Sequence, residues 1–134
     1  MKLERNALLI GGLMSKQKQL PESVIESQIF HYLRGRGVLC FKSIQAGFFD
    51  PVRKVFRKQA SPYFRKGVSD CLGLLPDGRF LAIEIKARYG KVSPEQQRFI
   101  DDVNNSGGVA FVARSVQDVV DKLSSIIGSS TPMK

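Results

Sequence analysis

The sequence predicts an α/β fold, in which a mixed β-sheet is flanked by helices on both faces. Stretches with helical periodicity alternate with short apolar stretches rich in β-branched and aromatic residues, and a PDG turn joins two of the apolar stretches. The length of 134 residues, with 43% hydrophobic and 25% charged residues, is typical of one globular domain. We expect a domain over residues 21–128, preceded by an arm (1–20) and followed by a tail (129–134).

The first half of the chain is predicted to supply one helix and one strand. The helix begins near Pro21, carries apolar residues at helical spacing and ends at Gly35 and Gly37. The next stretch, VLCFKSIQ, is rich in strand-forming residues. A connection of roughly twenty residues follows, which is long for a loop without structure. Because Asp50 and Pro51 within it precede apolar residues at helical spacing, we expect one or two helical turns there.

The second half is predicted to supply a hairpin, a helix, a strand and a last helix. Residues 69–75 and 79–87 are expected to pair as antiparallel strands around the PDG turn. The SPEQ stretch is a capping-box pattern that begins a helix, and two consecutive glycines end it. VAFVA is a predicted buried strand, and Ser115 is expected to cap a helix that runs to about Ile127.

The chain is strongly basic, and its basic residues gather in the long connection. Lys and Arg number 21 against 12 Asp and Glu, which gives a net charge of +9 and favours a polyanionic partner, nucleic acid first and an acidic membrane surface second. Aromatic residues are interleaved with the basic ones, as in surfaces that bind phosphates and stack on bases; a solvated charged surface is the alternative. The expected nucleic-acid-binding residues are Arg53, Lys54, Arg57, Lys58, Arg65 and Lys66.

Two cysteines without a C-x-x-C pattern indicate neither a disulfide framework nor a zinc site, and they suit a reducing cytoplasm. The apolar stretch ALLIGGLM is too short to span a bilayer and is a poor signal peptide. We therefore expect a cytoplasmic protein without a membrane partner.

The hairpin is predicted to bring two acidic residues together. Because the turn has three residues, each step back along the first strand matches a step forward along the second, and Asp70 falls opposite Glu84. Opposed side chains have Cβ atoms about 5 Å apart, so two carboxylates there repel unless a cation lies between them. Lys86 points to the same side as Glu84. A turn of two or four residues would instead aim Ser69 or Cys71 at Glu84.

These groups predict a site for Mg²⁺ or Mn²⁺, which prefer oxygen ligands and can hold a phosphate oxygen. A nearby lysine could orient the attacking water and offset charge in the transition state of phosphodiester hydrolysis. The alternative is a solvated pair of charges on a strand surface, which the apolar flanks in FLAIEIKA and the opposed Asp70 disfavour. Asp77 is excluded as a ligand because the turn itself explains it.

The residues in order resemble the VRR-NUC nucleases of the PD-(D/E)XK superfamily, from about residue 21 to residue 122. The segments that carry the resemblance are ESQIFHYLRGRG, GVSDCLGLL, GRFLAIEIKA, GKVSPEQ and GGVAFVARSVQDV. The resemblance implies a restriction-endonuclease-like core, and it identifies residues 21–128 as the nuclease domain. It further implies that Asp70 and Glu84 bind the metal, that the backbone carbonyl of Ile85 is a further ligand and that Lys86 is catalytic.

Two further site residues are implied by the same resemblance. Glu26 would be the acid on the first helix, a possible metal ligand, and Gln96 the supporting polar residue on the helix after the site. Glu22, one helical turn away, remains the alternative to Glu26, and a solvated helix surface remains the alternative for either. For Gln96 the alternative is the capping box with Ser93.

Small stand-alone members of this family resemble Holliday-junction resolvases and act as homodimers. The resemblance therefore implies a Mg²⁺- or Mn²⁺-dependent endonuclease that cuts branched DNA as a homodimer, in a bacterial or phage-infected cell, without a small-molecule organic cofactor. The alternative is a non-catalytic DNA-binding or recombination-accessory module on the same fold.

Overall fold

The computed structural model describes residues 19–44, 48–57 and 61–128. Most of the expected arm, the expected tail and Lys58 lie outside these ranges. Within them, no helix is long and apolar enough to cross a membrane.

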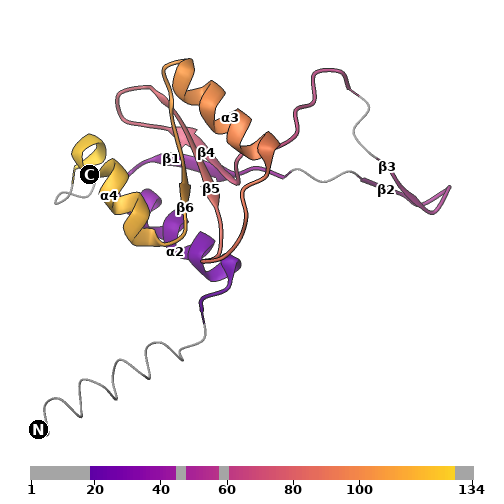
Figure 1. Cartoon of the computed structure of the whole chain (residues 1–134), viewed down its shortest axis with the longest axis horizontal. Helices are drawn as coiled ribbons and strands as arrows, with labels where there is room; N and C mark the ends of the chain where they lie inside the picture. The colour runs from indigo at the N-terminus through magenta and orange to yellow at the C-terminus, as the bar shows by residue number, and fades with distance from the viewer. Residues whose placement is uncertain (1–18, 45–47, 58–60, 129–134) are drawn as a thin grey trace, which may run out of the picture.

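A four-stranded mixed sheet forms the centre of the molecule (Figure 1). Its strands lie in the order β1 (Leu39–Lys42), β4 (Cys71–Leu74), β5 (Phe80–Ile85) and β6 (Val109–Ala113). The first three are antiparallel neighbours, whereas β5 and β6 are parallel. The parallel pair is joined by a crossover helix, as this geometry requires.

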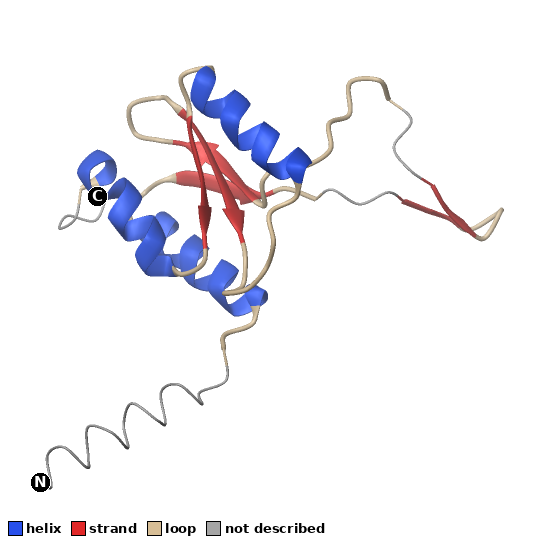
Figure 2. Cartoon of the chain, in the orientation of Figure 1, coloured by secondary structure: helices blue, strands red, loops and turns tan. Residues whose placement is uncertain are grey.

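Helices cover both faces of the sheet, as predicted (Figure 2). On one face, α2 (Glu22–Gly35) and α4 (Val116–Ile127) share a core with the inward side chains of all four strands. On the other face, α3 (Pro94–Asn105) packs over β5 and β6 around Ala82 and Ala110. The predicted α/β class and the restriction-endonuclease-like core are confirmed.

The helix ends are those that the sequence signals predicted. Ser93 and Gln96 form a complete capping box at the start of α3, and Ser115 caps α4 by accepting the N–H of Asp118 at 3.1 Å. The chain leaves α3 through Gly107, whose φ of 96° favours glycine. These caps fix the two helices at defined positions against the sheet.

The hairpin of β4 and β5 has the predicted register. The N–H of Leu75 donates to the carbonyl of Arg79 at 2.9 Å, and the N–H of Gly78 donates to the carbonyl of Leu75 at 2.8 Å, which closes a three-residue turn. The ladder ends with Cys71 opposite Ile83. Both strands are shorter than predicted, but their pairing is the one on which the site depends.

The prediction of helical turns in the long connection is wrong. The segment forms a second, two-stranded sheet of β2 (Phe48–Asp50) and β3 (Val55–Arg57), and Figure 1 shows it well apart from the central sheet. Aspartate followed by proline begins a β-turn as readily as a helix. Here residues 51–54 form that turn, and Lys54 has a φ of 55°, which a helix would not tolerate.

Candidate active site

The paired strands bring Asp70 to the main chain of β5. Asp70 directly precedes Cys71, the first paired residue of β4, and its Oδ2 accepts the N–H of Ile85 at 2.9 Å. The side chain thus makes one further bond to β5 just before β4 begins. Since the N–H and the carbonyl of one residue in a strand point to the same side, the Ile85 carbonyl is also directed towards the β4 side.

Glu84 is a buried acid without a hydrogen-bond partner for one of its oxygens. Its side chain is 2% exposed, and Oε1 is fully buried and unpaired among the described residues. Burial, followed by the neighbouring carboxyl of Asp70, raises the pKa of Glu84 to about 9, and Lys86 opposes the shift. An ionised carboxylate is therefore costly here unless further positive charge is present.

Lys86 is held next to this acid. Its N–H donates to the carbonyl of Ala113 on β6 at 3.0 Å, which continues the parallel ladder beyond β5. Its side chain is 15% exposed, and Nζ lies 3.9 Å from Oε2 of Glu84. The predicted convergence of Asp70, Glu84 and Lys86 is present, because Asp70 and Lys86 both act on the carboxyl group of Glu84.

The two acids of α2 act on different neighbours. The charge of Glu22 is a further, weaker cause of the raised pKa of Glu84. Glu26 accepts a hydrogen bond from Nζ of Lys42 at 3.1 Å, in an ion pair that ties α2 to β1. Both acids lie near the start of α2, at the end of the molecule where β5 and β6 finish (Figure 2). Glu22 therefore acts on the candidate metal ligand, whereas Glu26 is engaged by a lysine.

Gln96 takes part in the capping box. Its Oε1 accepts the N–H of Ser93 at 2.9 Å, and its own N–H donates to Oγ of Ser93 at 3.1 Å. The capping alternative is thus observed. Only the amide nitrogen of the Gln96 side chain can still donate to a substrate.

A divalent cation fits the group of oxygens at the end of the hairpin. No cluster of three or more His, Cys, Asp and Glu side chains that could hold a metal occurs within the described ranges. Asp70, Glu84 and the Ile85 carbonyl would instead provide two carboxylates and one main-chain oxygen, with water completing the shell, as Mg²⁺ prefers. The unpaired Oε1 of Glu84 is the observation that favours this fit.

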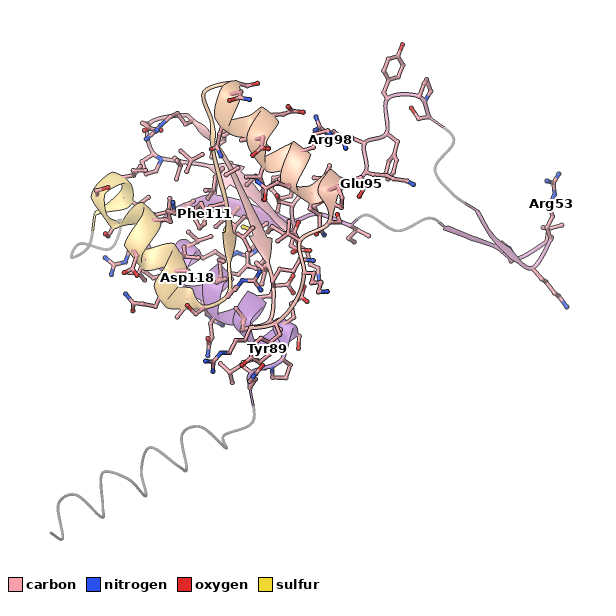
Figure 3. All side chains as sticks on the ribbon, viewed as in Figure 1. Arg53, Tyr89, Glu95, Arg98, Phe111 and Asp118 are labelled. Atoms are coloured by element: carbon pink, nitrogen blue, oxygen red, sulfur yellow. The ribbon has the colours of Figure 1, made fainter. Side chains whose placement is uncertain are left out.

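The predicted nucleic-acid-binding residues fall into two groups. Arg53 and Lys54 are exposed in the turn between β2 and β3, a pair of strands that we call the outer hairpin, and Arg57 is in β3. Figure 3 shows Arg53 at the far end of this hairpin. Arg65 instead contacts α3, because it donates to Asp102 at 2.6 Å and lies over the ring of Phe99 at 5.2 Å. The exposed Lys66 follows it in the chain. Their part in binding nucleic acid stays a prediction.

Asp77 lies in the turn as predicted, where it accepts the N–H of Arg79 at 3.0 Å and its guanidinium at 2.8 Å. The sequence interpretation missed a different residue, Arg114, which follows β6 and donates to main-chain carbonyls in the loop after Lys86. Main-chain acceptors leave no pattern in a sequence. The basic and aromatic run KARYGK in that loop was the available signal.

One of three comparisons with known proteins identifies the family of the chain. The family model described as the VRR-NUC domain matches residues 40–117, more than half of the chain, from β1 to the start of α4. The matched segment includes the hairpin and the residues around its open end. A search of curated proteins and a search of solved structures gave no match. The chain belongs to the VRR-NUC domain family, and it therefore carries a nuclease domain.

Proposed function

We propose that the protein is a Mg²⁺- or Mn²⁺-dependent endonuclease that hydrolyses phosphodiester bonds in branched DNA and acts as a homodimer. The observation that carries the proposal is the buried, unpaired oxygen of Glu84 beside Asp70 and Lys86. A carboxyl pair inside an apolar sheet is unfavourable for folding, whereas it is suited to hold a cation against a phosphate.

Each residue of the site has a distinct part in this reaction. Asp70, Glu84 and the Ile85 carbonyl would hold the metal, which, when bound, lowers the pKa of water and polarises the phosphate. The ammonium of Lys86, next to Glu84, orients the attacking water and offsets negative charge as the phosphate is attacked. The amide nitrogen of Gln96 donates to a phosphate oxygen, while its oxygen keeps the start of α3 in place.

The charge distribution supports DNA as the substrate. A net charge of +9 favours a polyanion, and Arg53 and Lys54 are exposed at the tip of an outer hairpin that could reach along DNA beyond the site. A four-way junction requires two cuts, and a two-fold dimer presents two sites with the matching symmetry. The proposed substrate and assembly rest on this symmetry argument and on the family.

The test compares cleavage of a four-way junction, a fork, a flap, single-stranded DNA and linear duplex, with Mg²⁺, with Mn²⁺ and with EDTA. We expect metal-dependent cutting of the branched substrates. Asp70→Asn and Lys86→Ala should each reduce the rate by roughly 100-fold or more, the cost of removing one electrostatic contact to the transition state. Asp77→Asn, the same change in the distant turn, should cut like the wild type.

Robust cutting by both site variants would refute the mechanism. Salt-sensitive binding of the wild type without cleavage of any substrate in either metal would select the non-catalytic DNA-binding module instead. Light scattering of the purified protein measures the oligomeric state, and a monomer that cuts junctions would refute the dimer alone.

A further inference from the structure

The loop of residues 87–91, directly after Lys86, presents charged and aromatic side chains to solvent. Arg88, Tyr89 and Lys91 are all exposed, and Tyr89 is 74% exposed. Figure 3 shows Tyr89 at the end of the molecule where α2 begins, the end at which the candidate active site also lies. Nothing in the site described above uses these side chains.

Hydrogen bonds from the side chain of Arg114 hold the main chain of this exposed loop. Nη1 of Arg114 donates to the carbonyls of Ala87 at 2.9 Å, Arg88 at 3.2 Å and Gly90 at 2.7 Å. The N–H of Gly90 donates back to Ala87 at 3.0 Å, which closes the turn. Hydrogen bonds from a guanidinium are stronger than neutral ones, so a single side chain fixes the main chain of the whole turn.

Arg114 is itself fixed by the start of α4. Its N–H donates to Oδ2 of Asp118 at 2.8 Å, and the N–H of Asp118 donates to the capping Oγ of Ser115. The loop is therefore connected through Arg114 to a capped helix. These hydrogen bonds position residues that are exposed, so they add little to the packing of the core.

Arg88 and Tyr89 in this loop are suited to stacking on a base. The guanidinium carbon of Arg88 lies 5.5 Å from the centroid of the Tyr89 ring, which is a cation–π contact. One face of the ring is thus ordered by a cation, while most of the side chain is open to solvent. An ordered, exposed aromatic ring next to positive charges is the arrangement with which proteins hold unpaired bases and their phosphates.

The position of Tyr89 in the chain, close to Lys86, indicates which nucleotide its ring would contact. Tyr89 is three positions after Lys86, and three steps of extended chain span at most about 10 Å. A base stacked on Tyr89 would therefore belong to a nucleotide close to the phosphate at Lys86. The loop also borders a groove with a mostly apolar lining, to which Arg88 and Arg114 contribute.

We propose that Arg88 and Tyr89, positioned by Arg114, form a second nucleic-acid contact that takes an unpaired base beside the phosphate at Lys86. The proposal rests on the proposed function for its substrate, and it adds a specificity: DNA with unpaired nucleotides near the cut should bind better than blunt duplex. In intact duplex, stacking between neighbouring base pairs covers the base faces that the ring would need.

The test measures binding by fluorescence anisotropy in EDTA, so that the DNA stays intact. The probes are a fork with single-stranded arms, single-stranded DNA and a blunt duplex of equal length. We expect Tyr89→Ala to weaken binding of the fork and the single strand about tenfold, the usual worth of one stacked base, and to leave duplex binding unchanged. Tyr89→Phe, which keeps the ring, should bind like the wild type.

Two further variants separate stacking from charge and from folding. Arg79→Ala removes one positive charge at the opposite end of β5 and should affect all three DNAs equally. Arg114→Met should reproduce the Tyr89→Ala defect and increase hydrogen exchange of the amides at 88–90, while the melting temperature shows that the fold persists. Unchanged exchange in Arg114→Met would overturn the positioning role.

The contact itself is overturned if Tyr89→Ala binds fork and single strand as the wild type does, or weakens duplex binding to the same extent. These readings are independent of cleavage. A wild type that never cuts in Mg²⁺, together with a selective Tyr89→Ala defect, would refute the endonuclease and retain the contact. A wild type that cuts, with no Tyr89→Ala defect, would support the endonuclease and refute the contact.

Discussion

Glu84→Gln should make the metal-free protein less sensitive to alkaline pH. Burial, followed by the neighbouring Asp70 carboxyl, raises the pKa of Glu84 from an ordinary 4.5 to about 9 in the folded protein. Between these two values the folded state keeps a proton that the unfolded chain releases. The free energy of unfolding therefore falls as pH rises through this window, and it is constant below 4.5 and above 9 on account of this group.

The slope for one proton is about 1.4 kcal/mol per pH unit, so the wild type should lose about 2.7 kcal/mol between pH 6 and pH 8 from Glu84 alone. Glutamine has nearly the shape of the protonated acid and does not ionise. The variant should therefore lack this loss. Its free energy of unfolding relative to that of the wild type should increase by roughly 2–3 kcal/mol between pH 6 and pH 8.

The assay is urea unfolding followed by circular dichroism at pH 6 and pH 8, in EDTA, for the wild type and for Glu84→Gln. Glu95→Gln is the matched control, because Glu95 is an exposed acid in the first turn of α3. Its stability should change with pH in parallel with the wild type. If Glu84→Gln also runs parallel to the wild type, the buried acid is ionised without cost and the reasoning about the site fails.

The remaining predictions concern the supports of the site. Gly67→Ala should destabilise the protein by more than about 1 kcal/mol, since Gly67 has a φ of 80° and an added Cβ would lie 2.4 Å from the carbonyl carbon of Glu95. Gly35→Ala, in open space at the end of α2, should be neutral or stabilise by up to about 1 kcal/mol. Asn104→Ala should cost about 1–3 kcal/mol, because Asn104 satisfies both the N–H and the carbonyl of Ala110. Urea midpoints measure all three.

The register of the central hairpin could be predicted because it follows from local rules. A turn of three residues fixes which positions face each other, and the alternating direction of side chains in β5 places Glu84 opposite to Ile83 and Ile85. The start of α3 could be predicted for the same reason, since a capping box involves four consecutive residues.

Features that depend on distant segments could not be predicted. Lys42 binds Glu26 across sixteen positions of sequence, and Arg114 reaches back to the loop after Lys86. Neither contact has a spacing that a pattern could reveal. Asp50 and Pro51 suit helical turns and a β-turn equally well, so the local pattern does not distinguish them, and residues 51–54 form the turn of the outer hairpin.

The surroundings of Glu84 indicate why the fold keeps an unfavourable residue. Its neighbours in β5, Ile83 and Ile85, are fully buried in the core on the opposite face, so the strand cannot shift to expose the acid without exposing them. A leucine at position 84 would remove the cost of desolvation and the unpaired oxygen together. Stability alone thus favours replacing Glu84. The proposed metal site gives a reason to keep it, because a cation would offset the charge of Glu84, and Asp70, which already binds the adjacent main chain, is in place to share that cation.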